Sequence, residues 1–470
     1  MPLTLEQTIK MSKIKDILER ENQRQERSLA RLRMLKDDFR EAAKQQLKKY
    51  VSNDTWKKLC EMINCTINVY DTVISEISMI YNENPQRIFE PVNESETAAH
   101  HVEIIESIYK KNRINQKMKK ANRYLNAVNT VALHPVFRKG TIAVDLLTPN
   151  VLSIEQDDED LTAATLVAIR KEYVDSMSTK IGTAKHTVWT AESHYQVSGD
   201  FEKKSMNEND INPYGFLPFV FIHREVPDGN FWDETSGNDL YECTLIASCL
   251  QTLIDSYFVW NSFKQLAINS RDLPDGLAHA PDKVIHLESP DDSATVLDFT
   301  IALKELLESL RTYITSVAQN YGIDWNSLVL QAQEASGRAL RIKSSKLQRL
   351  WNNQLEIFQD AETELFEQIK KIYYVHTGID LQVEMKIKFS PMENYRDERE
   401  DLENLKAEMD FNLKDLVMIF MERNKGYKNY EEAKDKVAEI IKTNNEMKGL
   451  IDDPVDKILG GLNGNDNTGV

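Results

Sequence analysis

The residue types that most often carry enzyme chemistry form no known catalytic pattern in this sequence. It contains no GxxxxGKS/T motif that would cradle ATP phosphates, no HExxH zinc motif and no GxSxG nucleophile motif. The glycine-rich run LGGLNG at 459–464 lies in a polar tail with no strand before it, so it is not a dinucleotide-binding fingerprint. We therefore expect a protein that is not an enzyme and needs no cofactor.

Candidate metal ligands and thiols are equally unpromising. His100 and His101 are adjacent, so they would point to different sides of a helix, and Asp291 and Asp292 suit a solvated loop. The four cysteines show neither CxxC nor zinc-finger spacing, and a chain this long needs no disulfide framework. We expect no metal site, and buried reduced thiols at Cys60, Cys65, Cys243 and Cys249.

The charge balance argues against a protein that grips nucleic acid tightly. The chain has 58 Lys and Arg against 75 Asp and Glu, a net charge of −17. Proteins that neutralise many phosphates are usually basic, since each neutralised phosphate adds affinity. If this protein handles DNA, it must do so with weak adhesion or through local basic patches.

Such patches exist, because the charge is unevenly distributed. Basic residues outnumber acidic ones in 1–60, five basic residues and no acid lie in 335–355, and acids dominate 271–300. Any single run fits a solvated helix face. The alternation of sign along the chain would also suit docking between neighbouring subunits.

The elements that must position these charges are mostly helical in the first quarter of the chain. We expect a long polar helix over 4–50, a helix over 54–82 that stops at Asn84-Pro85, and a helix over 96–128 that closes near His134-Pro135. Short β-branched runs punctuated by glycine and proline then predict an antiparallel sheet of five or six short strands over 136–222. The fold class is α+β, mostly helical.

Long helices return in the second half. We expect helices over 238–270 and 300–321, separated by a proline-rich acidic insert, and a third over 337–374. The third helix repeats apolar residues at helical spacing, a predicted packing seam of Leu340, Leu347, Trp351, Phe358, Leu365 and Ile369. A strand at 381–389 and two charged helices over 396–448, joined near Gly426, follow. The tail is expected to be disordered.

Several segments, in this order, resemble the portal (head–tail connector) protein of tailed double-stranded DNA bacteriophages. They are INVYDTVISEISMIYNENPQRI, GTIAVDLLTPNVLSIEQDD, NPYGFLPFVFIHRE followed by NDLYECTLIASCLQTLIDSYF, and SGRALRIKSSKLQRLWNNQLEIFQDAETELFEQI. The resemblance covers most of residues 60–445. Its strength lies in the ordered set, since no single segment is as specific as a metal-ligand motif.

The resemblance implies a portal-like ring subunit with wing, stem, clip and crown regions. Its parts would be an N-terminal polar helical region (1–53), the wing (54–236), a stem helix (237–270), the clip (271–299), a second stem helix (300–321), the tunnel loop (322–336), a long wing or channel helix with a strand (337–395), crown helices (396–448) and a disordered tail (449–470).

The implied function is a channel made by a ring of about twelve identical subunits at one capsid vertex. Double-stranded DNA would be packaged and ejected through it. The implied partners are the major capsid protein, the scaffolding protein, the large terminase subunit and the neck or adaptor (head completion) protein. The protein would be made in the host cytoplasm and end in the virion. No membrane is involved, because no stretch approaches the length of apolar residues that a span needs, and the N-terminus has no secretory signal.

Three groups of residues would serve this channel. The tunnel loop carries polar and acidic side chains that meet phosphates through water without binding tightly: Asp324, Asn326, Gln331, Gln333 and Glu334. A basic face on the following helix would either face DNA or neutralise acids of the next subunit: Arg338, Arg341, Lys346 and Arg349. The clip would present mostly acids: Asp272, Asp275, Asp282, Lys283, Glu288, Asp291 and Asp292.

Two other classes of protein remain open. A non-enzymatic helical oligomeric scaffold unrelated to DNA fits the long polar N-terminus and the packing seam. A terminase or other packaging enzyme is a third reading, and the missing P-loop argues against it.

Overall fold

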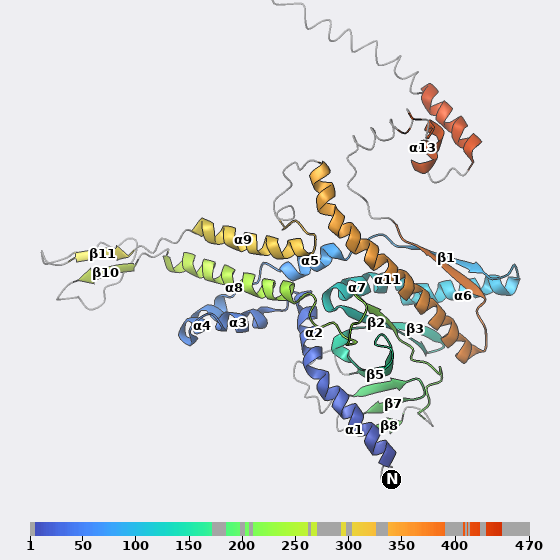
Figure 1. Ribbon diagram of the computed structural model, residues 1–470, viewed down its shortest axis with the longest axis horizontal. Helices are drawn as coiled ribbons and strands as arrows, with labels where there is room; N and C mark the ends of the chain where they lie inside the picture. The colour runs from blue at the N-terminus through green and yellow to red at the C-terminus, as the bar shows by residue number, and fades with distance from the viewer. Residues whose placement is uncertain are drawn as a thin grey trace, which may run out of the picture. The chain divides into compact units, whose positions relative to one another are not determined.

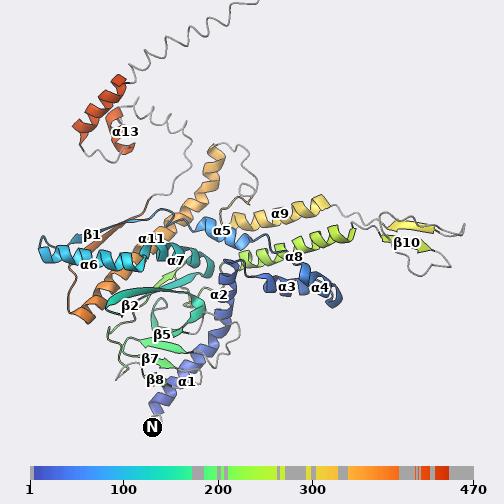
Figure 2. The same cartoon turned by 180° about the vertical axis from the view of Figure 1, so that it is seen from behind.

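The computed structural model describes residues 5–171, 185–197, 203–205, 210–261, 265–269, 293–297, 303–325, 337–390, 408, 411, 414–423 and 429–443. The chain divides into two compact units, residues 1–392 and 393–470. The first unit holds the sheets and the long helices (Figures 1 and 2). The mostly helical α+β fold class is confirmed.

The N-terminal region is helical, but the expectation of one helix over 4–50 is wrong. The described residues form α1 (Leu5–Arg20), α2 (Asn22–Met34) and α3 (Arg40–Lys48). The main break follows Met34, where the chain turns through Asp37 with φ of 57°. Met34 and Phe39 on either side are buried, so packing of both apolar anchors bends the chain between them.

The expectation of a single helix over 54–82 is also wrong. The chain forms α4 (Asn53–Leu59), the 3₁₀ turn η1 (Cys60–Met62) and α5 (Val69–Ile77). Two asparagines cause the interruption, because their side chains accept backbone N–H groups that a helix would otherwise use. Asn64 Oδ1 accepts from the Thr66 N–H at 3.0 Å, and Asn68 Oδ1 accepts from the Asp71 N–H at 3.0 Å.

A third expected helix, over 96–128, is divided at Arg113. Its parts are α6 (Glu96–Asn112) and α7 (Ile114–Val128), and Arg113 has a left-handed φ of 51°. The preceding Asn112 is buried and bonds to the backbone of the adjacent strand, donating to the Ile142 carbonyl at 2.9 Å and accepting from the Val144 N–H at 2.8 Å. This anchor to the sheet sets the position of the break.

The β region is larger than the single sheet of five or six strands expected over 136–222. Within the described residues from 130 to 223, eight strands form two antiparallel sheets. The first has the order β3-β2-β9, and the second runs β4-β5-β6-β7-β8. The strands are β2 (Thr130–Arg138), β3 (Thr141–Leu147), β4 (Leu152–Gln156), β5 (Ala164–Arg170), β6 (His186–Thr190), β7 (His194–Val197), β8 (Lys203–Ser205) and β9 (Val220–His223).

His134-Pro135 does not close a helix. Both residues lie inside β2, where Pro135 pairs with Val144 of β3. The β2 strand is buried over most of its length, with helices α7 and α11 packed against it. Burial in the sheet therefore outweighs the local turn signal of proline.

Two long helices, α8 (Asn238–Asn261) and α9 (Leu303–Asn320), lie side by side (Figures 1 and 2). They are antiparallel, because Tyr321 at the end of α9 contacts Asp239 at the start of α8, and Tyr313 contacts Cys243 one turn further along. We call this pair the α8–α9 rod. A helix expected over 300–321 is confirmed as α9.

The other expected stem helix, over 238–270, ends earlier. Residues 265–269 form β10 (Gln265–Asn269), which pairs antiparallel with β11 (Ser293–Leu297). The pairing partner lies far along the chain, so local helical periodicity does not show it. The candidate clip residues lie between these two strands and outside the described residues.

The third expected helix is confirmed as α11 (Gly337–Thr377), 41 residues long. Its predicted packing seam is confirmed where side chains are described: Phe358, Leu365 and Ile369 are fully buried, and Leu347 and Trp351 partly. The expected strand at 381–389 is β12 (Val383–Lys388). It pairs antiparallel with β1 (Gln86–Pro91), which the sequence analysis missed.

The N-terminal helices join the sheets to the rod. On α2, the buried Arg24 donates to the carbonyls of Pro149 at 3.0 Å and Leu152 at 2.6 Å. Its guanidinium also lies 3.9 Å from the Trp232 ring centre. Further along the chain, α3 packs against α8. Helices α2 and α3 therefore bridge two parts of the first unit.

In the second unit the described residues form α13 (Leu416–Arg423) and a helix over 430–443. Residues 414 and 415 are not helical, so the expectation of one continuous helix from 396 into this segment is wrong there. The Asp415 carboxylate accepts the Met418 N–H at 2.7 Å, which caps the start of α13.

Candidate functional site

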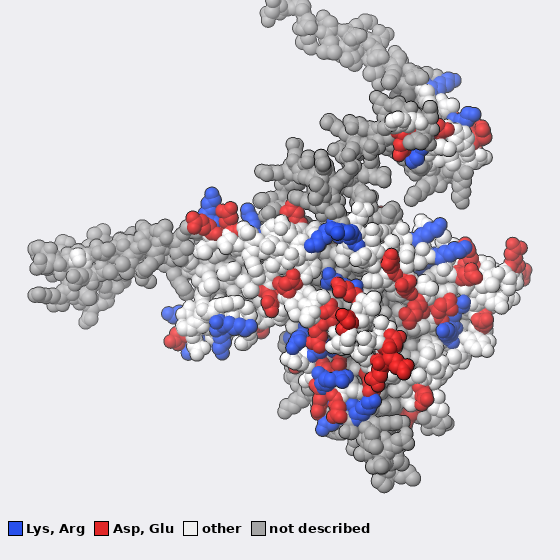
Figure 3. Space-filling model, viewed as in Figure 1, with Lys and Arg blue, Asp and Glu red and all other residues white. Residues whose placement is uncertain are grey.

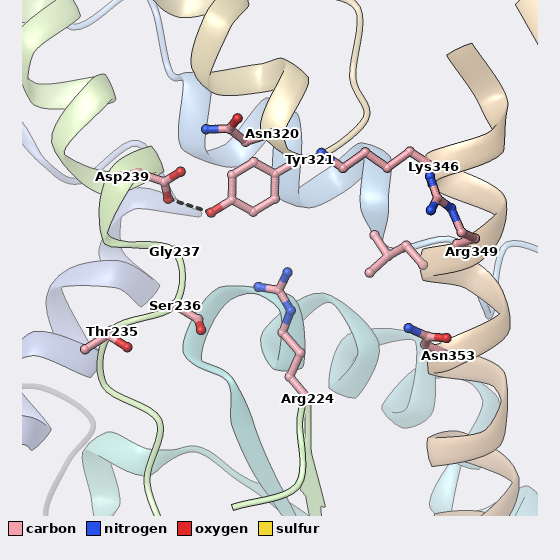
Figure 4. A pocket seen from close by; sticks show the side chains of 11 residues that line it. Arg224, Thr235, Ser236, Gly237, Asp239, Asn320, Tyr321, Lys346, Arg349 and Asn353 are labelled. Atoms are coloured by element: carbon pink, nitrogen blue, oxygen red, sulfur yellow. Dashed lines mark hydrogen bonds between the residues drawn. The ribbon is translucent and has the colours of Figure 1, made fainter. Parts of the chain in front are cut away.

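One candidate site is a cleft of about 690 Å³ where the start of α8 and the end of α9 meet α11. The start of α8, the end of α9, the middle of α11 and the residue after β9 all line it (Figure 4). Two residues of the expected basic face, Lys346 and Arg349, lie in its wall. We call it the junction cleft.

The end of α9 is fixed by a tight C-terminal motif. The Ile323 N–H donates to the Ala318 carbonyl at 3.1 Å, and the Gly322 N–H donates to the Gln319 carbonyl at 3.0 Å. This pairing is a Schellman motif, which satisfies the last carbonyls of a helix and requires a left-handed residue. Gly322 supplies it with φ of +78°.

Gly322 also lets α9 approach α11 closely. A Cβ atom at this position would lie 3.1 Å from the Lys346 Cβ and 3.4 Å from the Leu347 backbone nitrogen. Both the backbone conformation and the space therefore require glycine here. The close approach sets the distance between the rod and the long helix, and with it one wall of the junction cleft.

Lys346 reaches from α11 to the end of α9. Its Nζ donates to the Gln319 carbonyl at 3.1 Å. A cation at this position is stabilised by the negative end of the helix dipole. Part of the role of Lys346 is therefore structural, since it holds two helices together at the cleft.

Arg224, which follows β9, points into the cleft toward Tyr321 (Figure 4). Its guanidinium carbon lies 5.9 Å from the Tyr321 ring centre. The Tyr321 hydroxyl donates to Asp239 Oδ1 at 2.5 Å, and burial followed by this hydrogen bond raises the pKa of Tyr321. Arg224 Nη1 is buried and has no hydrogen-bond partner among the described residues.

The junction cleft thus carries an excess of positive charge. Arg224, Lys346 and Arg349 are its cations, and Asp239 is the acid in its lining. A buried guanidinium nitrogen that makes no hydrogen bond is costly unless something binds to it.

The structure places the remaining predicted site residues as follows. Asp324 lies four residues beyond α9 and is half-buried. Arg338 and Arg341 lie on α11, within a stretch whose side chains are outside the description. The other predicted positions fall outside the described residues: Asn326, Gln331, Gln333, Glu334, Asp272, Asp275, Asp282, Lys283, Glu288, Asp291 and Asp292.

Sequence reasoning missed Arg224, Tyr321 and Asp239 as members of one site. They come from three elements far apart in the sequence, so no spacing pattern relates them. The available signals were a charged residue directly after a buried strand and a Tyr-Gly pair at the end of a helix, and each is common.

The α8–α9 rod offers a second surface of interest. No Lys or Arg occurs in α8, and its acids are Asp239, Glu242 and Asp255. Figure 3 shows the near face of the rod as mostly uncharged atoms, with a small charged group over α9. Several large apolar side chains of the rod are 37–51% exposed: Leu250, Phe258, Val259, Leu306 and Leu307.

The opposite side of α8 carries small hydroxyl residues at every fourth position, all of them buried: Thr244, Ser248, Thr252 and Ser256. Thr244 accepts the Tyr70 N–H at 2.8 Å, and Thr252 accepts the Asn64 N–H at 2.9 Å. These hydrogen bonds give acceptors to backbone N–H groups at the start of α5 and in the segment before it. They fix which face of α8 points inward and which stays exposed.

Four histidines lie in strands of the two sheets, two of them buried and two half-buried. Burial lowers the pKa of His134, His186, His194 and His223 to about 4. His134 Nδ1 contacts the Pro218 carbonyl at 2.7 Å, and its ring stacks on Phe219 with 4.2 Å between centres. These side chains serve packing in the neutral form.

The cysteines are free, and Cys60, Cys243 and Cys249 are buried, with Cys65 half-buried. Burial raises the pKa of Cys249 to about 11 and that of Cys243 to about 12. Such thiols are poor nucleophiles at neutral pH. Across the described ranges, no three His, Cys, Asp or Glu side chains are grouped to hold a metal ion. Among the described helices, none is both long and apolar enough to cross a membrane.

Comparison with known proteins gives limited information. No family model matches the sequence, and no curated protein matches it. One similar solved chain belongs to a structure of the virion of a native gene transfer agent (GTA) particle, at 9% identity and a TM-score of 0.38, covering 77% of this chain and 90% of that one. Another belongs to the neck of an empty GTA particle, at 11% identity and a TM-score of 0.40, covering 75% and 89%. Likenesses this distant carry no argument about function.

Proposed function

We propose that this chain is a portal-type subunit, which assembles into a closed ring of about twelve copies and forms a conduit for double-stranded DNA at one vertex of a virion. The observation that carries the proposal is the α8–α9 rod. Its helices are side by side, its charge is low, and its apolar side chains are exposed in the single chain.

The exposed apolar residues support assembly. Fully burying a large apolar side chain contributes about 1.5–3 kcal/mol, so covering side chains such as Phe258 and Leu307, which are 49% and 42% exposed, would add roughly 1 kcal/mol each. Neighbouring copies in a ring would cover this surface with the rods of adjacent subunits. Repetition around the ring multiplies the gain.

The charge of the rod supports a conduit that does not hold its cargo. The two helices together carry five acids and two bases, Lys304 and Arg311, both on α9. Because affinity for DNA grows with each neutralised phosphate, a wall with few cations permits sliding. In a ring, each acid becomes a circle of like charge that keeps the duplex away from the wall.

The remaining regions take the roles that the sequence resemblance implies. In this proposal, residues 271–299, which include β11, are the clip that docks the large terminase subunit and then the neck or adaptor protein. Residues 322–336 form the tunnel loop, and residues 396–448 form the crown. The major capsid protein and the scaffolding protein surround the ring during assembly.

Native mass spectrometry of the full chain tests this proposal. We expect a closed species of about twelve subunits. Leu307→Lys on the rod should reduce ring formation, whereas Val226→Lys, an equally drastic change at a loop residue that is 82% exposed, should leave it intact. A monomer, or an open-ended series of oligomers, would instead favour the rival class, a helical scaffold unrelated to DNA.

The basic face is tested on the same rings. Reversal of Arg338 and Arg341 to Glu should reduce ring assembly more than DNA retention if these residues neutralise acids of the next subunit. Intact rings that lose DNA would assign the two arginines to the channel wall. Wild-type rings should bind DNA only weakly and with a shallow dependence on salt concentration, because few phosphates are neutralised.

A further inference from the structure

The junction cleft contains a cationic group that the fold leaves unused. Arg224 Nη1 is buried, and none of the described residues accepts a hydrogen bond from it. Arginine has five N–H donors and stays charged, so burial of an unpaired nitrogen costs free energy in the empty cleft. Because this nitrogen is covered as the side chain now lies, an acceptor in the cleft would remove that cost when the Arg224 guanidinium turns to meet it.

The surrounding charges define the acceptor. Lys346 and Arg349 on α11 line the same cleft, and Asp239 at the start of α8 is bound to the Tyr321 hydroxyl. The lining therefore holds more cationic than acidic side chains. The Lys346 ammonium group has three N–H donors and uses one of them in its hydrogen bond to the Gln319 carbonyl, so its other donors can serve a ligand.

The shape of the cleft favours a phosphate over a carboxylate. A carboxylate is planar and pairs best with a single guanidinium fork. Here the cations approach from two different elements: Arg224 follows β9, and Lys346 and Arg349 come from α11 (Figure 4). A tetrahedral group with several acceptor oxygens can meet donors from several directions. The first turn of α8, through Gly237 and Asp239, also lines the cleft and places the positive end of the helix dipole there.

We propose that the junction cleft is a phosphate-binding site, in which Arg224 and Lys346 hold one phosphate group, either of soluble inorganic phosphate or of a DNA backbone. The bound phosphate would tie the end of β9 to α11 at the point where the α8–α9 rod meets the sheets. This site goes beyond the conduit proposed above and does not depend on it, since every single chain contains the complete cleft.

Calorimetric titration of the full-length protein with inorganic phosphate, at constant ionic strength in chloride, tests the site. We expect one phosphate per chain, with affinity at least about tenfold weaker in Arg224→Gln and in Lys346→Gln, which corresponds to about 1.4 kcal/mol. Arg311→Gln is the matched control, because it removes a cation from the exposed surface of α9, away from the cleft. The affinity of Arg311→Gln for phosphate should equal that of the unaltered protein.

The two sources of phosphate are separated by competition. If a short DNA duplex displaces phosphate, the site accepts a backbone phosphate; if it does not, the ligand is the soluble ion, and both results keep the site. The proposal fails if phosphate does not bind at millimolar concentration, or if succinate binds equally well. It also fails if Lys346→Gln, with a melting temperature equal to that of the unaltered protein, binds phosphate unchanged.

Discussion

A buried ion pair between β1 and α11 provides the sharpest test of how the first unit is held together. Glu362 is completely buried on α11, and Arg87 of β1 is 8% exposed. Arg87 Nε donates to Glu362 Oε2 at 2.9 Å, Arg87 Nη2 donates to Oε1, and the Tyr81 hydroxyl donates to Oε1 at 2.9 Å. We predict that Glu362→Gln strongly destabilises the β1–β12 pair.

The magnitude follows from what the substitution leaves behind. Glutamine presents one oxygen and one NH₂ group, so the Arg87 fork meets a donor where it had an acceptor. Removing one partner of a buried pair typically costs about 3–5 kcal/mol, because the other charge stays buried without compensation. If β1 and β12 open by local unfolding, their backbone amides should exchange about two to four orders of magnitude faster.

Hydrogen exchange of peptides from β1 and β12 measures this directly. Glu356→Gln is the matched control, because Glu356 is exposed on the same helix and its change should cost within about 0.5 kcal/mol. The double variant Arg87→Met with Glu362→Met should be less damaged than Glu362→Gln alone, because it leaves no unpaired charge. Equal exchange in Glu362→Gln and Glu356→Gln would refute the reasoning.

Three further predictions concern pH, backbone conformation and the N-terminal bridge. The pKa of His134 is about 6.5 in the unfolded chain and about 4 in the folded one. Neutral His134 therefore contributes roughly 3 kcal/mol to the free energy of unfolding above pH 6.5, and this contribution is lost as the pH falls toward 4. His134→Gln should flatten the dependence of the melting temperature on pH over this range. Gly322→Ala should cost more than Gly378→Ala in urea unfolding, since both residues have positive φ but only the first would crowd α11. Arg24→Leu should cost about 3 kcal/mol and speed proteolysis of α2, because it leaves the buried Glu21 carboxylate with only the exposed Arg20, 3.8 Å away, as an ion-pair partner; equal proteolysis of the two proteins would contradict the bridging role.

The long helices were predictable because their signal is local. Residues 303–320 and 337–377 contain no internal glycine or proline, and Phe358, Leu365 and Ile369 repeat at helical spacing. Where such a pattern is long and uninterrupted, propensity and burial favour the same structure.

The helix breaks near the N-terminus were not predictable, because their causes are tertiary. Asn112 breaks a helical stretch by bonding to a strand, and Asn68 does so by capping α5 while its amide donates to the Met34 carbonyl at 2.7 Å. The strands β1 and β10 were missed for the same reason, since each pairs with a strand distant in sequence. Strand pairing depends on partners that a local window does not contain.

The sequence predicted part of the lining of the junction cleft. The basic run on α11 pointed to Lys346 and Arg349, which the structure brings to the junction cleft. Arg224 is the residue that makes the cleft distinctive, and it becomes visible only when β9 and α11 are placed side by side. Charge runs therefore locate a cationic helix face, whereas the fold decides which other elements complete it.

Negative-stain electron microscopy of the purified full-length protein tests the central claim most directly. The account predicts closed rings with an open centre, in which the α8–α9 rods of neighbouring copies cover one another. Separate compact monomers, or assemblies without a central opening, would contradict it.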